Sequence, residues 1–368
     1  MPRPTVHHAP FGSVQGTRTD LWTLDSGTGV RAEVLTYGAS LHRLTVPDTT
    51  GAGASVVRSL ATLDDYTAKH PYFGAVVGRY ANRIAHGRFV LDGTEHHIPA
   101  NDRGHALHGG PDGFHAKVWE AAPDRTDDSV SVRLTLHSPD GDMGFPGALD
   151  ATVTYTLDTA GTLAVDYASV TDRPTVVNLT NHAYFDLAGH DDVLGHTLQI
   201  DADSYVPVDD DGIPLGPPAE VGGTPFDLTA PQALGECLGT ENAQLRAAGG
   251  FDHCWVLRDS DSGGLRRAAR LTAPDAARVM EVWTTEPGIQ VYTANQLDGS
   301  FTDGTGRRHG RHGSLCLETQ HLPDSPNRPD LPSTVLRPGD TARSRTELRF
   351  PHLQHESHGG RPVEPAHV

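Results

Sequence analysis

The chain has 368 residues, of which 36% are hydrophobic, and its formal net charge is −18. Such acidity argues against nucleic acid or an anionic membrane surface as a partner. No stretch approaches the ~18 consecutive apolar residues of a membrane helix, and the first residues lack the apolar core of a signal peptide. We therefore expect a cytoplasmic protein. Its cysteines, Cys237, Cys254 and Cys316, are too scattered for a disulfide framework or a zinc knuckle, and we expect them to be buried and reduced.

Short strands dominate the predicted secondary structure. Apolar and polar residues alternate along many segments, which is typical of half-buried strands. Helical periodicity is weak, and the candidates are residues 60–68 and 231–238. Closely spaced strands with Gly, Pro and Asp between them predict an all-β sandwich or barrel. In chain order, strands are expected near residues 30–35, in hairpins at 89–98 and 153–167, and near 130–136, 279–283, 289–293 and 315–319.

The composition contains no break that would mark a linker. We therefore expect one catalytic domain over residues 11–352. Residues 1–10 and 353–368 are predicted to be disordered ends, and the last segment is rich in His, Gly and Pro. Residues 259–270 are predicted to form a surface loop.

The stretch from Thr175 to Leu187 begins as an extended apolar run and then becomes crowded with polar side chains. If it is one strand, its period of two places His182 on the same face as Asn178, Thr180 and Tyr184. Such a face is either exposed to solvent or lines a site, and this segment alone does not decide between the two.

Other polar motifs lie at strand ends. Asn82 and Arg83 occur together, and His108 lies in a glycine-flanked loop. Asp252 precedes an apolar run, and Gln290 shares a face with Tyr292. Each of these could have a purely structural role, such as a surface ion pair, a turn or a cap. Glu318 is harder to dismiss, because a carboxylate in a core-like strand is costly unless it is paired or faces a cavity.

These motifs, in this order, resemble the aldose 1-epimerase (galactose mutarotase) family over residues 25–350. The resemblance implies a large, mostly antiparallel β-sandwich with a ligand groove. It also implies that the general acid is His182 and the general base is Glu318. The chain departs from the family at Asp186, where an asparagine is usual, and over residues 236–250. By the same resemblance, the sugar is bound by Asn82, Arg83, His108, Asp252 and Gln290.

The chemistry of anomer exchange suits these residues. Opening a cyclic hemiacetal needs one acid and one base beside the same carbon, and neither a metal ion nor a cofactor. An imidazole can donate a proton near neutral pH, and we expect Glu318 to be ionised there. Arg79 is expected to be structural. The expected partner is a free monosaccharide such as galactose or glucose, and the protein would be a monomer or homodimer.

Several alternatives are weighed against this reading. A glycosidase could use Glu318 and Asp252, but it needs a defined separation that sequence cannot measure. A metal site could use His105 and His108. The sequence, however, has no His-x-His or His-Glu-x-x-His spacing with a following carboxylate there. A hexose-phosphate 1-epimerase of the same fold would want additional cationic residues. A non-catalytic sugar-binding or regulatory protein would tend to have lost His182 or Glu318, so we favour the enzyme acting on free aldohexoses.

Overall fold

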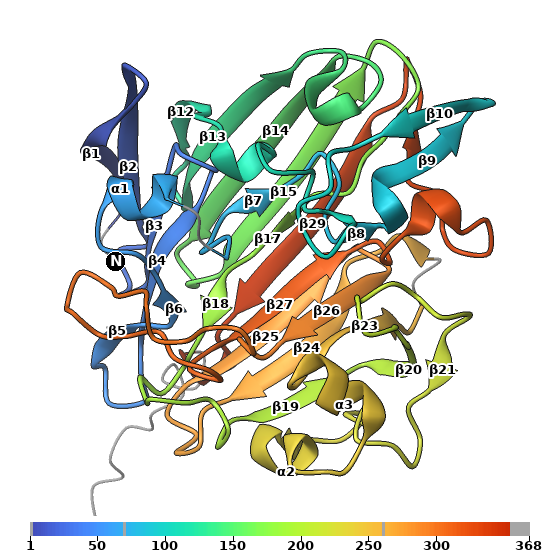
Figure 1. Cartoon of the computed structure of the whole chain (residues 1–368). Helices are drawn as coiled ribbons and strands as arrows, with labels where there is room; N and C mark the ends of the chain where they lie inside the picture. The colour runs from blue at the N-terminus through green and yellow to red at the C-terminus, as the bar shows by residue number, and fades with distance from the viewer. Residues whose placement is uncertain (1–2, 69–70, 260–261, 354–368) are drawn as a thin grey trace, which may run out of the picture.

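A computed structural model describes residues 3–68, 71–259 and 262–353. Within these residues, antiparallel strands form three larger sheets and several two-stranded pairs (Figure 1). The N-terminal sheet has five strands, in the order β1 (Thr5–Val14), β2 (Thr17–Asp25), β3 (Arg31–Leu35), β4 (Leu41–Pro47) and β5 (Gly53–Ser55).

The largest sheet has nine strands and combines the middle of the chain with its end. The hairpin of β14 and β15 lies beside β29, the last strand, which pairs with β15 from Leu163 to Ser169. The order is β12 (Glu120–Arg125), β13 (Ser129–Ser138), β14 (Leu149–Asp158), β15 (Leu163–Thr171), β29 (Ala342–Arg349), β25 (Val279–Thr284), β24 (Arg266–Thr272), β19 (Thr197–Ile200) and β22 (Gln232–Ala233).

The third sheet has seven strands and carries most of the predicted polar motifs. Its order is β21 (Ala219–Glu220), β20 (Ala202–Val206), β23 (Asp252–Leu257), β26 (Gly288–Tyr292), β27 (Leu315–Gln320), β18 (Tyr184–Phe185) and β6 (Val57–Arg58). The short pairs are β8 (Arg83–Ile84) with β11 (Ala106–Leu107), β9 (Arg88–Leu91) with β10 (Thr94–His97), β16 (Thr175–Val176) with β28 (Val335–Leu336), and β7 (Val76–Val77) with β17 (Thr180–Asn181).

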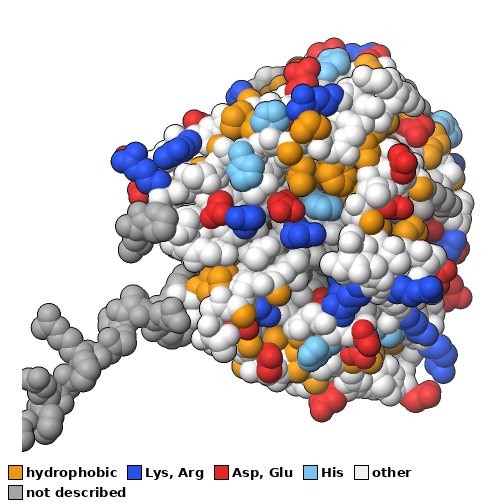
Figure 2. Space-filling model, turned by 90° about the vertical axis from the view of Figure 1, so that its left-hand side faces the viewer, with side chains coloured by type: hydrophobic (Ala, Val, Ile, Leu, Met, Phe, Trp, Pro, Cys, Tyr) orange, Lys and Arg blue, Asp and Glu red, His pale blue; other side chains and the backbone are white. Residues whose placement is uncertain are grey.

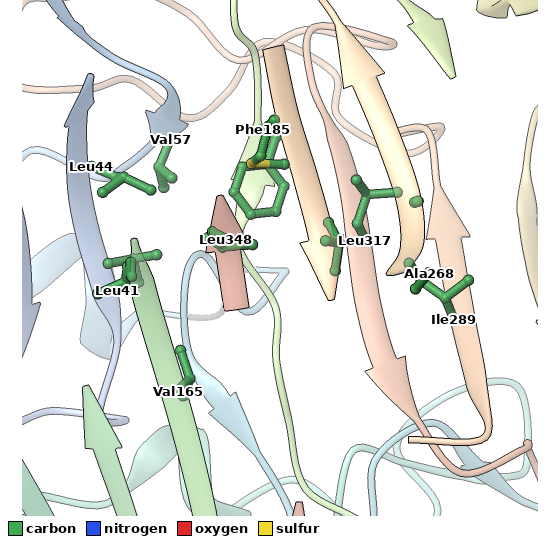
Figure 3. Packing of buried hydrophobic residues seen from close by; sticks show 14 of the residues in the cluster. Leu41, Leu44, Val57, Val165, Phe185, Ala268, Ile289, Leu317 and Leu348 are labelled. Carbon is green, nitrogen blue, oxygen red and sulfur yellow. The ribbon is translucent and has the colours of Figure 1, made fainter. Parts of the chain in front are cut away.

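One buried apolar cluster joins the three larger sheets. Leu41 comes from the five-stranded sheet, Val165 from the nine-stranded sheet, and Ile289 and Leu317 from the seven-stranded sheet (Figure 3). Because side chains alternate along a strand, the neighbours of Ile289 and Leu317 point away from this core. The predicted β-sandwich is therefore confirmed, and one face of the seven-stranded sheet is left for polar residues.

Several sequence predictions need correction. Residues 1–10 were predicted to be a disordered end, but residues 5–10 form the first part of β1 (Thr5–Val14), which pairs with β2. The loop predicted over 259–270 contains the start of β24. The stretch from 175 to 187 is not one strand, because β16, β17 and β18 pair with three different partners. The weak helices appear as α1 (Leu63–Thr67) and α2 (Leu234–Leu238), and α3 (Ala243–Ala248) was not expected.

The remaining features concern the chain ends and the surface. The predicted C-terminal tail, apart from residue 353, lies outside the described residues. Among the described residues, no helix has the length and apolar character needed to cross a membrane. Acidic and basic side chains are interspersed over the face in Figure 2, so the net charge of −18 is not gathered in one patch there.

Candidate active site

A cavity of about 400 Å³ opens on the polar face of the seven-stranded sheet. This volume lies at the small end of the range for ligand pockets and suits a compact ligand. Strands β18, β23, β26 and β27 form its floor, and the segments around β8 and β11 form its wall. The lining residues are Pro71, Tyr72, Asn82, Arg83, Asn101, Asp102, Leu107, His108, His182, Tyr184, Asp252, Tyr292, Gln296, Phe301 and Glu318.

Strand register places the floor residues. Along β27, the leucines at 315 and 317 enter the core, so Cys316 and Glu318 face the cavity side. Glu318 lies opposite Gln290 of β26, and Asp252 of β23 lies opposite Tyr292. The alternation recognised in the sequence therefore brings residues from separate strands onto one face.

Glu318 and His182 lie side by side at the base of the cavity. Oε1 of Glu318 is 3.7 Å from Nε2 of His182, and the side chains are 2% and 6% exposed. The other carboxylate oxygen, Oε2, is buried and has no hydrogen-bond partner among the described residues. Burial raises the pKa of Glu318 well above its usual range, Asp252 adds to this, and Arg83 opposes it. Glu318 was expected to be ionised near neutral pH, and burial makes its ionisation less favourable than that of an exposed glutamate.

His108 is held from behind by the backbone of Asn82. The Asn82 amide donates to Nδ1 of His108 at 3.1 Å, and the His108 amide donates to the Asn82 carbonyl at 3.0 Å. Both residues have positive φ, 61° for Asn82 and 53° for His108, a conformation that is uncommon for residues other than glycine. Burial, with a contribution from the positive charge of nearby His182, lowers the pKa of His108 well below its usual value.

Three side chains of metal-ligand type meet here. Ligand atoms of His108, His182 and Glu318 lie within 4.8 Å of one another. Because the amide of Asn82 donates to Nδ1 of a neutral His108, the ring proton is on Nε2. A metal ion at Nδ1 would displace the amide, and one at Nε2 would require the ring proton to leave or to move to Nδ1, where it would oppose the N–H of Asn82. The donor set therefore suits hydrogen bonds to hydroxyl groups better than a metal ion.

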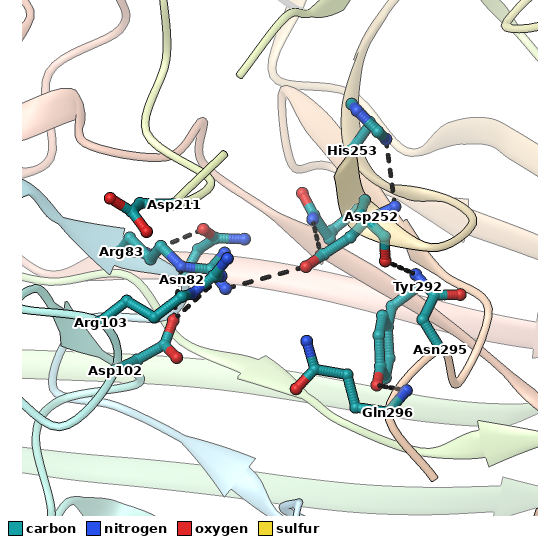
Figure 4. A network of polar contacts seen from close by, with 12 residues as sticks. Asn82, Arg83, Asp102, Arg103, Asp211, Asp252, His253, Tyr292, Asn295 and Gln296 are labelled. Carbon is teal, nitrogen blue, oxygen red and sulfur yellow. Dashed lines mark hydrogen bonds and ion pairs between the residues drawn. The ribbon is translucent and has the colours of Figure 1, made fainter. Parts of the chain in front are cut away.

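Arg83 connects two carboxylates along the wall of the cavity (Figure 4). Its Nε donates to Asp102 at 2.9 Å, and its Nη2 is 3.8 Å from Asp252. Burial alone would lower the pKa of Arg83, but the neighbouring acids raise it. Gln290 donates from Nε2 to Asp252 at 2.7 Å. The result is a fixed row of donors and acceptors, which is the surface that a polyol needs.

Aromatic rings frame the two histidines. The ring of Tyr72 lies 4.6 Å from that of His108 and 5.6 Å from that of His182, and the ring of Tyr184 lies 5.1 Å from His182. Tyr72 also has positive φ, 61°. These rings pack around the two imidazoles next to Glu318.

All the predicted site residues except Gln290 line the cavity. Gln290 is buried and reaches the site through Asp252. His105 does not join the cavity lining, and Arg79 is structural as predicted, since its guanidinium donates to four backbone carbonyls. Two further lining residues were not predicted: Asp102, although it lies in the same loop as His108, and Tyr72, for which no periodic pattern existed.

A histidine–carboxylate pair beside a row of polar groups, in a small cavity on an antiparallel β-sandwich, defines a protein built for acid–base chemistry on a small polyhydroxylated molecule. The family model described as Aldose 1-epimerase matches residues 20–349. This chain therefore belongs to the aldose 1-epimerase family.

Individual relatives agree with this assignment. A galactose mutarotase from Rattus norvegicus is 41% identical over 350 residues, covering 92% of this chain and 99% of the relative. An aldose 1-epimerase from Escherichia coli is 35% identical and covers 94% and 99%. Galactose 1-epimerase from Lactobacillus acidophilus has 27% sequence identity to this chain, and its crystal structure superposes with a TM-score of 0.83. The match covers 94% of this chain and 98% of the relative.

Proposed function

We propose that this member of the aldose 1-epimerase family interconverts the α and β anomers of free aldohexoses, with His182 as the acid and Glu318 as the base. The observation that carries the proposal is the 3.7 Å between Nε2 of His182 and Oε1 of Glu318 in a polar cavity. The ring oxygen and the anomeric hydroxyl are bonded to the same carbon, so an acid and a base that serve both must lie side by side.

The proton transfers balance over one cycle. Glu318 takes the proton of the anomeric hydroxyl while the imidazolium of His182 gives its Nε2 proton to the ring oxygen, and the bond between C1 and the ring oxygen breaks. The C1–C2 bond of the open aldehyde rotates. Glu318 then returns its proton to the carbonyl oxygen, and His182 takes back the proton that it gave to the ring oxygen. The ring closes as the opposite anomer.

The electrostatics support this assignment. The raised pKa of Glu318 brings a carboxylate base closer to the operating pH, which increases its strength as a base. Asn82, Arg83, His108 and Asp252 supply the hydrogen bonds that orient the sugar, and a wrong epimer would leave some of these buried groups unpaired.

The lining of the cavity argues against a phosphorylated substrate. Among the described lining residues, Arg83 is the one Lys or Arg, and it is already engaged by Asp102 and Asp252. Glu318 adds a third acidic group to the same lining. This arrangement would repel a phosphate, so the free sugar is favoured over a hexose phosphate.

Polarimetry on freshly dissolved α-galactose and α-glucose tests the proposal. The enzyme should speed the approach to the same equilibrium rotation, whereas Glu318→Gln and His182→Asn should each lower the rate by about 10²- to 10⁴-fold. Calorimetry should still detect sugar binding to Glu318→Gln.

A matched control is Glu347→Gln, which changes a buried carboxylate in the nine-stranded sheet outside the cavity and should keep the full rate. Sugar binding without any acceleration by the unmodified protein would contradict the enzymatic role and favour a sensor. Acceleration confined to glucose 6-phosphate would contradict the free-sugar assignment.

A further inference from the structure

Cys316 lies beside the proposed acid. It belongs to β27, two residues before Glu318, so both side chains leave the strand on the same face. The thiol is completely buried, and its sulfur is 3.5 Å from Nδ1 of His182. One strand therefore contacts both nitrogens of the catalytic ring, with Cys316 at Nδ1 and Glu318 at Nε2.

The proposed cycle places a requirement on Nδ1. His182 must give a proton from Nε2 when the ring opens and take it back when the ring closes. Between these steps Nε2 needs a free lone pair, so the remaining ring proton must be on Nδ1. A buried N–H without an acceptor is costly, and the acceptor also decides which tautomer is populated.

We propose that Cys316 is the positioning residue of His182, an inference that rests on the proposed function. Its sulfur accepts the Nδ1–H, keeps the neutral ring in the Nδ1–H tautomer, and leaves Nε2 as the one nitrogen that exchanges a proton with the sugar. Burial, with Glu318 and Asp252 nearby, raises the pKa of Cys316 well above its usual value, so the partner is a neutral thiol.

A thiol has a chemical advantage over the more familiar carboxylate partner. Sulfur is a weak acceptor, so it orients the ring without strongly stabilising the imidazolium. A carboxylate at this position would favour the charged ring and weaken it as an acid. It would also add a fourth acidic group beside Glu318, Asp252 and Asp102.

The test combines nitrogen NMR with kinetics on the full chain. In protein with ¹⁵N-labelled histidine, His182 is assigned by comparison with His182→Asn, and the Nδ1 and Nε2 shifts report the tautomer. Neutral His182 should carry its proton on Nδ1 in the unmodified protein, and Cys316→Ala should shift the population toward Nε2–H. Because Cys316 is absent from the cavity lining, kcat should fall about tenfold, the value of one hydrogen bond, with KM little changed.

Two further variants separate positioning from packing. Cys316→Ser keeps an acceptor and should restore both the Nδ1–H tautomer and most of kcat. Cys237→Ala removes a buried free thiol from α2, distant from the site in sequence, and should leave kcat unchanged. An unchanged tautomer in Cys316→Ala, or a serine variant no better than alanine, would overturn the proposal. Failure of the unmodified protein to accelerate mutarotation would instead overturn the proposed function, because the NMR result does not depend on turnover.

Discussion

Asp252 and Glu318 are two carboxylates that share the influence of one arginine. Asp252 lies 3.8 Å from the Arg83 guanidinium, and its negative charge is one of the causes that raise the pKa of Glu318. The pKa of the proposed base is therefore raised in part by a residue that also belongs to the proposed sugar-binding row. In the proposed mechanism, Asp252 and Arg83 therefore affect both the binding of the sugar and the pKa of Glu318.

This link predicts a shift in the pH profile. Asp252→Asn removes a negative charge that raises the pKa of Glu318, so the pKa of Glu318 should fall. The ionised base would then persist to lower pH, and the acidic midpoint of kcat/KM for galactose should move to lower pH while its maximum decreases. Polarimetry between pH 4 and pH 8 would measure both effects.

The control for this shift is Asp92→Asn, which changes an exposed carboxylate outside the cavity. It should leave the acidic midpoint in place. An unshifted midpoint in Asp252→Asn would show that the acidic limb does not report Glu318.

The residue types at the site were predictable from the sequence, but their environment was not. Alternation along β27 identified Glu318, since Leu315 and Leu317 enter the core and Glu318 lies on the opposite face. The same pattern could not reveal that Gln290 contacts Asp252 instead of lining the cavity, or that Cys316 contacts His182. Those contacts depend on which strands are neighbours in the sheet, and so does the shifted pKa of Glu318.

At the scale of elements, a buried ion pair joins the end of β18, which follows His182, to its neighbouring strand β6. Asp186, the position where the family usually has asparagine, is 2.5 Å from Nη2 of Arg58. Their side chains are 2% and 9% exposed, and Arg58 also donates to the carbonyls of His190 and Gly313. Arg58 is on β6 and Asp186 directly follows β18, so the pair secures the edge of the seven-stranded sheet.

Removing one partner should therefore be costly. Asp186→Ala leaves the Arg58 guanidinium buried without its counter-ion, and the free energy of unfolding should fall by about 3–5 kcal/mol. Urea denaturation followed by tryptophan fluorescence would measure the change. Arg337 and Asp92 form an exposed pair between distant segments, and Asp92→Asn, which suits the positive φ of 49° at this position, should hardly move the midpoint. Equal effects of the two substitutions would contradict this account.

The elements that were mispredicted lack apolar alternation. In β1, mostly exposed side chains leave backbone pairing with β2 as the main contact, so no periodic signal marks it as a strand. In β24, Arg267 pairs with Asp201 and Arg270 pairs with Glu281, and these charges made a strand resemble a loop. Strands with a clear apolar face, such as β14, β15, β26 and β27, were predicted correctly.

At the scale of the whole molecule, we propose that the predicted domain of residues 11–352, together with the first residues of β1, folds as one unit, because the three larger sheets contribute to one buried cluster. A half-buried histidine makes the stability of this unit depend on pH. Nδ1 of His321, just beyond β27, is 2.7 Å from Oε2 of Glu286. Burial alone would lower the pKa of His321, but the hydrogen bond and charge of Glu286 raise it.

A raised folded-state pKa stabilises the protein on the acidic side. The contribution is fully present below the unfolded-state pKa of about 6.5 and is lost as the pH rises through the folded-state value. Glu286→Gln should therefore destabilise the protein more at pH 6 than at pH 9. Urea midpoints of the two proteins at both pH values would measure this, and a difference that does not change with pH would refute it.

The strand order also has a consequence during synthesis. Strand β15 pairs with β29, the last strand, and β18 pairs with β27, which is also made late. At translation rates of about 5–20 residues per second, β15 leaves the ribosome roughly 9–36 s before its partner is complete. During that interval its open edge can pair with other nascent chains, so we expect the yield in cells to depend on chaperones that occupy exposed strand edges.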